Sequence, residues 1–295
     1  MTIRHDMLAA AARAKHLLNE SVMDVIAFAS GQMNPDGGFK GRAEASDLYY
    51  TVFGIETLVA LGAGNRVAPA VDYLRQYADG RVLDLIGLAC LARCRANVID
   101  MATEAVFNKE LGRRLELYRC RDGGYGNVMG AECGTCYGCF LALGAYQDLG
   151  LTLPNPEGLI TCIHSLQRPD GAYANDAAIQ TGSAPATAAA VTALHYLGQP
   201  PAAASAQWLL ARSRATGGFL ATPTAPIPDL LSTATAIHAL ALTGAALESV
   251  RRPTLEFIDS LWSTDGAFAG NWLDETLDCE YTYYALLALG HLGGE

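Results

Sequence analysis

Lysine is scarce in this chain of 295 residues. Lys15, Lys40 and Lys109 are its only lysines, and 30 acidic residues against 20 basic ones give a formal net charge of -10. No basic run could neutralise a row of phosphates, so nucleic acid and anionic membrane surfaces are not expected partners. No stretch stays apolar and uncharged over the roughly 18 residues that a membrane span needs. The sequence therefore predicts no transmembrane helix.

The eight cysteines lack the spacing of a small disulfide-stapled domain. In a chain this long they indicate reduced, mostly buried thiols and a cytoplasmic location. The segment "CGTCYGC" holds Cys133, Cys136 and Cys139. If all three lie on one helix, the first and last are about 9 Å apart along its axis. One zinc ion cannot then bind all three, and helix packing is the favoured interpretation.

A short motif of two small residues followed by an aromatic recurs along the chain. The copies are "PDGGFKG", "RDGGYGN", "PDGAYAN", "ATGGFLA" and "TDGAFAG", with a weaker copy, "ADGRVLD". The Asp or Thr before the first Gly stands at positions 36, 79, 122, 170, 216 and 265. A nearly constant period of this length is typical of a repeat architecture.

Each repeat predicts a helical hairpin. A helix with a charged face precedes each Gly turn, and a second helix rich in Ala and Gly follows it. A helix that is apolar all round is buried on all sides, so the second helices should form an inner ring and the first an outer ring. No alternating strand pattern is present. We expect one all-α domain over 1–295, with an amphipathic N-terminal helix over 1–20 and six hairpins over about 21–293. An open solenoid is the alternative.

The segment "QRPDGAY" over 167–173 resembles the repeat of protein prenyltransferase β subunits and of terpene (squalene-type) cyclases. Residues 37–62 are similar to a prenyltransferase β repeat, and the resemblance extends over almost the whole chain. It implies an α/α toroid with a central cavity for a small isoprenoid molecule. Because prenyltransferase β subunits pair with an α subunit, it also leaves a partner subunit or a homodimer open. One fold hosts many reactions, so the chemistry has to come from the site.

The inner helices can be aligned on one anchor residue each. The anchors are Thr51, Cys136, Thr187, Thr233 and Thr282, and four places earlier stand Asp47, Glu132, Ser183, Asp229 and Asp278. Residues there cap a helix, which accounts for most of them. In the zinc-dependent prenyltransferases that the repeats resemble, Cys stands two places and His one place before the anchor. No repeat has either here, so the family zinc site is not intact, and an irregular site from Asp278, Cys279 and Glu280 is the remaining zinc option.

Class II terpene cyclases carry Asp-x-Asp-Asp-Thr in the same window, and the middle Asp is their proton donor. This chain has Asp278-Cys279-Glu280-Tyr281-Thr282. The resemblance makes Glu280 the donor and Asp278 its partner, with Tyr281 in place of the last Asp. A carboxyl beside an apolar cavity keeps its proton because desolvation raises its pKa.

Prenyl transfer is the second interpretation. Prenyl transfer ionises a diphosphate, and cations must stabilise the diphosphate leaving group. Of the loops expected to lead into the inner helices, only the first contains Lys or Arg, namely Lys40 and Arg42. In the prenyltransferase resemblance, Arg42 matches a diphosphate-binding Arg and Tyr50 matches a Tyr beside it, and Mg²⁺ would have to assist them.

Aromatic side chains suit an isoprenoid chain and stabilise carbocations. The candidate substrate-binding residues are Arg42, Asp47, Tyr49, Tyr50, Phe53, Tyr137, Asp229, Trp272 and Tyr284. The leading hypothesis is acid-initiated terpenoid cyclisation. Prenyl transfer and a non-catalytic toroid that binds a lipid or a protein are the alternatives.

Overall fold

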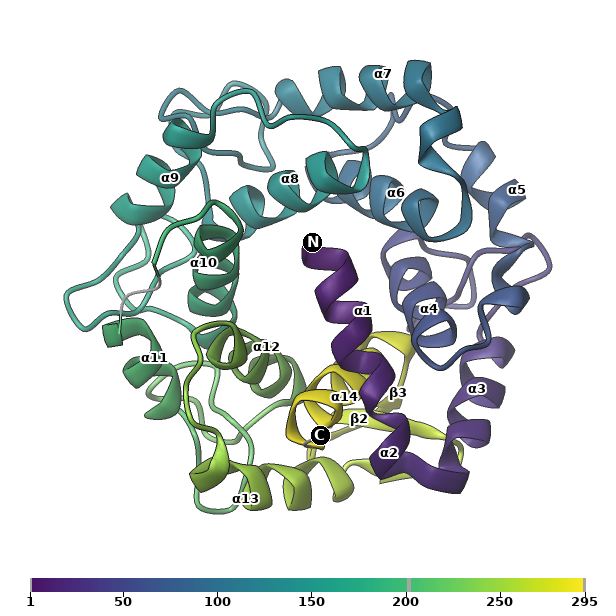
Figure 1. The fold of residues 1–295 in the computed structure, drawn as a ribbon, viewed down its shortest axis with the longest axis vertical. Coiled ribbons are helices and arrows are strands. Elements are labelled where there is room, and N and C mark those ends of the chain that lie inside the picture. The colour runs from purple at the N-terminus through teal and green to yellow at the C-terminus, as the bar shows by residue number, and fades with distance from the viewer. Residues whose placement is uncertain (1, 201–202, 294–295) are drawn as a thin grey trace.

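The computed structural model describes residues 2–200 and 203–293, and over these residues six helical hairpins form two concentric rings (Figure 1). The inner helices are α4 (Leu48–Ala60), α6 (Leu85–Val98), α8 (Cys136–Asp148), α10 (Ala184–Tyr196), α12 (Leu230–Leu242) and α14 (Cys279–Leu292). The outer helices are α3 (Val22–Gly31), α5 (Ala70–Arg75), α7 (Ala105–Glu116), α9 (Pro156–Ser165), α11 (Ala203–Leu210) and α13 (Glu248–Asp259). The predicted α/α toroid is confirmed.

The inner ring is closed. Each inner helix packs on the next, and α14 packs on α4, so the first and last hairpins are neighbours. Phe53 of α4 meets Tyr283 and Tyr284 of α14, with ring centroids 5.9 and 5.5 Å apart. Closure excludes the open solenoid, which would leave one apolar inner face uncovered at each end.

The Gly turns hold each hairpin together. Gly37 has φ +89°, and a Cβ there would lie 2.1 Å from the carbonyl oxygen of Pro69, so this position requires glycine. After the turn, the N–H of Phe39 donates to Oγ1 of Thr51 at 2.9 Å. The same bond joins the turn aromatic to the anchor in later repeats, at Tyr173–Thr187, Phe219–Thr233 and Phe268–Thr282.

This bond corrects the alignment of the third inner helix. The N–H of Tyr125 donates to Sγ of Cys139 at 3.5 Å, so the anchor of α8 is Cys139 and not Cys136. Thr135 caps the helix by accepting from the N–H of Gly138, and Glu132 lies outside it. Cys133 therefore precedes α8, contrary to the expectation that the three cysteines share a helix. The sequence does not distinguish these two anchors, because both are cysteines and they stand three places apart.

Strands were not expected, yet the loop before α14 forms a small antiparallel sheet. It consists of β1 (Trp262–Ser263), β2 (Ala267–Asn271) and β3 (Asp274–Leu277) in the order β1-β2-β3. The acidic segment from Asp274 to Tyr284 is thus split between a strand and a helix, and Asp278 caps that helix. The sheet is too short and too irregular in register to show an alternating pattern in the sequence.

The N-terminal segment forms α1 (Ile3–Arg13), followed by α2 (Lys15–Leu18), and α1 lies across the centre of the ring (Figure 1). Arg4 Nε bonds Asp148 at 2.9 Å, the Tyr196 hydroxyl donates to Asp6, and Arg13 Nε donates to the carbonyl of Gly290 at 3.0 Å. These partners lie at or near the C-terminal ends of α8, α10 and α14. Helix α1 therefore closes the ring at the end where the inner helices finish.

We expect Gly290→Ala to destabilise the protein. An added Cβ would lie 1.7 Å from the carbonyl oxygen of Ala10, so α1 would have to move away from α14. Overpacking of this kind costs about 1–3 kcal/mol of the free energy of unfolding, which denaturant titration measures. Gly31→Ala is the control, because a Cβ there meets nothing within 4 Å. Equal stability of the two variants would contradict the packing described.

Candidate functional site

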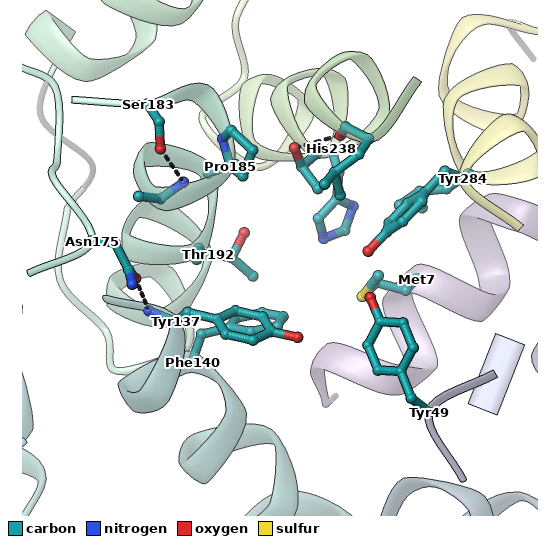
Figure 2. Close-up of a pocket in the computed structure, with 16 residues that line it drawn as sticks. Met7, Tyr49, Tyr137, Phe140, Asn175, Ser183, Pro185, Thr192, His238 and Tyr284 are labelled. Carbon is teal, nitrogen blue, oxygen red and sulfur yellow. Dashed lines mark hydrogen bonds between the residues drawn. The ribbon is translucent and has the colours of Figure 1, made fainter. Parts of the chain in front are cut away.

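The inner ring encloses a cavity of about 370 Å³. Its walls are mostly aromatic and aliphatic, and none of the described side chains that line it is an Asp, Glu, Lys or Arg. Figure 2 shows Tyr49, Tyr137, Phe140 and Tyr284 around it, with Met7 of α1 at one end. A smaller space of about 90 Å³ shares these five residues and lies beside it.

The corrected alignment explains which residues face these spaces, since lining side chains recur at fixed places on the inner helices. Two places before the anchor stand Tyr49, Tyr137, Pro185 and Leu231. Two places after it stand Phe53, Cys90, Leu141, Ala189, Thr235 and Tyr284. Five places after it stand Glu56, Arg93, Gly144, Thr192, His238 and Leu287, nearest α1. Here Leu88 is taken as the anchor of α6. We call these three groups the entry layer, the middle layer and the floor layer.

Charges on the floor of the smaller space neutralise one another. Arg93 lies 3.2 Å from Glu56 and 2.6 Å from Asp148, and Asp148 is also held by Arg4 of α1. Such buried ions are tolerated because each has a close partner. The network ties α1 to the inner ring and leaves none of these four groups without a partner.

Glu280 occupies the entry-layer position on α14. It does not line the cavity itself, but its Oε1 accepts a hydrogen bond of 2.6 Å from the hydroxyl of Tyr49, which does. Burial raises the pKa of the Glu280 carboxyl, and the neighbouring Asp278 raises it further, while the Tyr49 hydrogen bond and Arg42 act in the opposite direction. A carboxyl that tends to keep its proton is therefore joined to the cavity wall.

Asp278 has a structural role and an electrostatic one. Its Oδ1 caps α14 by accepting from the N–H of Tyr281 at 2.9 Å. Its Oδ2 is buried and has no hydrogen-bond partner among the described residues, and the nearest cation, Arg42, lies 3.6 Å away. Burial raises the pKa of Asp278, against the effect of its backbone hydrogen bonds and Arg42.

Arg42 is 45% exposed and directed at carboxylates. Its guanidinium lies 2.8 Å from Asp274 on β3, and 5.8 Å from the ring centre of Tyr281. The ring of Tyr281 packs against Gly270 of β2, where a Cβ would meet it at 2.5 Å. Asp274, Asp278, Arg42 and Tyr281 thus form a group on the outer side of Glu280.

The remaining candidates divide into two sets. Tyr49, Phe53, Tyr137 and Tyr284 line the cavities. Asp47 and Asp229 cap α4 and α12, Tyr50 packs edge-on against Tyr49 at 5.6 Å, and Trp272 packs on Phe257 of α13 at 5.3 Å. These four are not among the lining side chains. Trp272 lies in the turn between β2 and β3, which directs its ring to an outer helix.

Sequence reasoning missed Met7, Phe140 and the floor residue His238 as cavity residues. Thr192 and His238 both stand five places after their anchors, and this shared offset is the signal that could have found His238. Met7 carries no such signal, because nothing in the repeats fixes where the N-terminal helix docks.

No three His, Cys, Asp or Glu side chains within the described ranges are grouped so that they could hold a metal ion. All eight cysteines lie in those ranges and are free, and seven of them are buried. The prediction of unpaired, mostly buried thiols is confirmed. Within residues 2–200 and 203–293, no helix is both long and apolar enough to cross a bilayer.

We expect the raised pKa of Glu280 to reduce stability as the pH rises. Its contribution is complete below the pKa of an unfolded glutamate, about 4.3, and is lost as the pH rises through the higher pKa of the folded state. The free energy of unfolding of Glu280→Gln, minus that of the wild type, should therefore increase as the pH rises from 4. Glu275→Gln, at an exposed position on β3, controls for the change in net charge. A difference between the two free energies of unfolding that stays constant or decreases with pH would contradict the raised pKa.

Comparisons with known proteins agree with this architecture. A protein from Actinoplanes has a TM-score of 0.70 at 18% identity, over 93% of this chain and 99% of that one. The type II terpene cyclase MstE from Scytonema, as a variant with its product merosterolic acid A, has a TM-score of 0.67 at 13% identity, over 95% and 97%. A second variant of MstE, with its substrate geranylgeranyl dihydroxybenzoate, has a TM-score of 0.67 at 14% identity, over 95% of this chain and 97% of that one. At these identities the likeness shows the fold.

Among proteins of curated function, none matches the sequence significantly. The model of the prenyltransferase alpha-alpha toroid domain, however, matches residues 5–87, 118–207 and 187–293. These segments cover most of the chain and include all six inner helices, wholly or in part. The chain belongs to the prenyltransferase alpha-alpha toroid domain family.

Proposed function

We propose that this protein cyclises an isoprenoid chain by acid initiation, with Glu280 as the proton donor. The observation that carries the proposal is the pairing of Glu280 with Tyr49 at the wall of an uncharged aromatic cavity. The cavity volume falls in the range of about 300–1,000 Å³ that is usual for small-molecule sites.

Proton delivery follows from this pairing. When Glu280 is neutral it can donate to the oxygen of Tyr49, the reverse of the direction in the structure, and the Tyr49 hydroxyl is then free to turn toward an alkene. Glu280 passes its proton to the oxygen of Tyr49 while the hydroxyl proton of Tyr49 moves to an alkene carbon. The π electrons of the alkene form the new C–H bond and leave a tertiary carbocation, and Glu280 is left as a carboxylate. A neighbouring alkene then attacks the cation, and loss of a proton ends the reaction with no net change in composition.

The cavity walls suit the cation. The faces of Tyr49, Tyr137, Phe140 and Tyr284 offer negative electrostatic potential without a nucleophilic charge. Their packing, and the position of α1 over one end, limit the water that could trap the cation early. Asp278 supports the donor by raising the pKa of Glu280 through its proximity.

Prenyl transfer is less well supported by the geometry. A diphosphate would need Arg42, whose guanidinium faces Asp274 and Asp278. Lys40 is bonded to Glu44 at 3.0 Å. A transferred diphosphate would have to displace these acids or bring Mg²⁺ with it, whereas acid initiation uses the carboxyls as they stand.

Turnover in D₂O tests the proposal. Neutral polyprenes should give cyclic products that gain deuterium at the initiating carbon, because Glu280 exchanges its proton with solvent, and mass spectrometry reads this directly. Glu280→Gln should lower turnover by about 10²–10⁴-fold while the chain still binds. Glu275→Gln is the matched control and should keep its activity. Full activity of Glu280→Gln, or cyclic product without deuterium at that carbon, would refute the mechanism.

A further inference from the structure

A buried imidazole nitrogen faces the cavity without a hydrogen-bond partner among the described residues. His238 lies in the floor layer on α12, is 4% exposed, and directs its imidazole into the cavity (Figure 2). Its Nδ1 lies 2.9 Å from Nε2 of His291 on α14. Its Nε2 is buried and has no hydrogen-bond partner within the part of the chain that the structure describes. A buried polar atom in this state is stabilised by any ligand group that bonds to it.

The histidine pair is uncharged at neutral pH. Burial lowers the pKa of His238 to about 4 and that of His291 to about 3, and His195 and Arg13 act in the same direction. Two neutral imidazoles share one hydrogen between Nδ1 of His238 and Nε2 of His291. The free Nε2 of His238 is then an acceptor in one tautomer and a donor in the other. A hydroxyl group can bond to either form, since it both donates and accepts.

The surroundings of His238 select against an anion. Thr192 faces the same space from the floor layer of α10 (Figure 2). Leu287 of α14 supplies an apolar wall. No Lys or Arg of the described residues lines this cavity. A diphosphate placed here would lose its hydration without a counter-charge.

We propose that His238 binds the hydroxyl group of a neutral isoprenoid alcohol at the α1 end of the cavity. The isoprenoid nature of the ligand rests on the proposed function, while the hydroxyl subsite rests on His238. The entry layer, where Glu280 stands, and the floor layer are seven residues apart on each helix, or about 10 Å along the helix axis. A chain anchored by its hydroxyl at His238 therefore presents a distant alkene to Tyr49 and Glu280.

Equilibrium binding tests the subsite, with the full chain carrying Glu280→Gln so that ligand is not consumed. The probes are geranylgeraniol, the hydrocarbon that lacks its hydroxyl, and geranylgeranyl diphosphate. We expect the alcohol to bind about 2- to 10-fold more tightly than the hydrocarbon, as one neutral hydrogen bond allows, and the diphosphate to bind most weakly. Adding His238→Phe should abolish the preference for the alcohol and keep the affinity for the hydrocarbon. Adding His195→Phe, at an exposed position on α10, should change neither.

The outcomes separate this inference from the proposed function. If alcohol and hydrocarbon both bind but the preference is absent or survives His238→Phe, the hydroxyl subsite is overturned and the cyclase proposal stands. If the diphosphate binds most tightly, the neutral ligand class is overturned. If neither the alcohol nor the hydrocarbon binds, both proposals fail.

A second measurement uses the protein that retains His238, so its result does not depend on whether His238→Phe folds. The imidazole ¹⁵N resonance of His238 Nε2 should move when geranylgeraniol is added and stay in place with the hydrocarbon. Equal shifts with both probes, or no shift with the alcohol, would overturn the subsite.

Discussion

Among the described residues, one hydrogen bond fixes the rotation of the inner helix in five of the six repeats, and the cavity depends on these bonds. Helix α6, with Leu88 at the anchor position, follows the same register without the bond. The N–H of the turn aromatic donates to the anchor side chain, as from Phe39 to Thr51, while the cap four places earlier sets where the helix begins. Because start and rotation are set together, the same sequence offsets face inward around the ring. The entry, middle and floor layers follow directly. Without this bond, an inner helix could rotate about its own axis. Side chains that line the cavity would then move into the packing between helices, and packing side chains would face the cavity.

The repeated features could be predicted from the sequence, and the unrepeated ones could not. Six Gly turns and two kinds of helix specify the rings, because burial of apolar helices leaves few other arrangements. The register of Glu280 on α14 also followed, since Glu280 stands two places before its anchor, as Tyr49 does. The docking of α1 did not follow, because its partners, Asp148 and Tyr196, are contributed singly by different repeats. Cys139 was missed as an anchor because Cys136, three places earlier, offers the same side chain to a sequence alignment.

Charge in this molecule is kept away from the wall of the larger cavity. Toward α1 it is neutralised in pairs, where Arg93 lies between Glu56 and Asp148. On the outer side of Glu280 it gathers around Arg42 and Asp274. The wall between them carries hydroxyls, an amide and a neutral imidazole, which can orient a ligand without trapping a cation. The Glu280 carboxyl is joined to this wall through the phenol of Tyr49, so the carboxylate itself does not face the cavity.

The raised pKa of Glu280 and the cover provided by α1 belong to one physical argument. Desolvation is the largest cause of that shift, and it persists only while water is kept from the ring. Met7 of α1 lies at the cavity wall, and α1 can pack so closely only because Gly290 has no side chain. A glycine remote from the acid thus helps to keep the cavity dry. Water entering past a displaced α1 would lower the pKa of Glu280 and offer a nucleophile to any cation, and each effect alone would work against cyclisation.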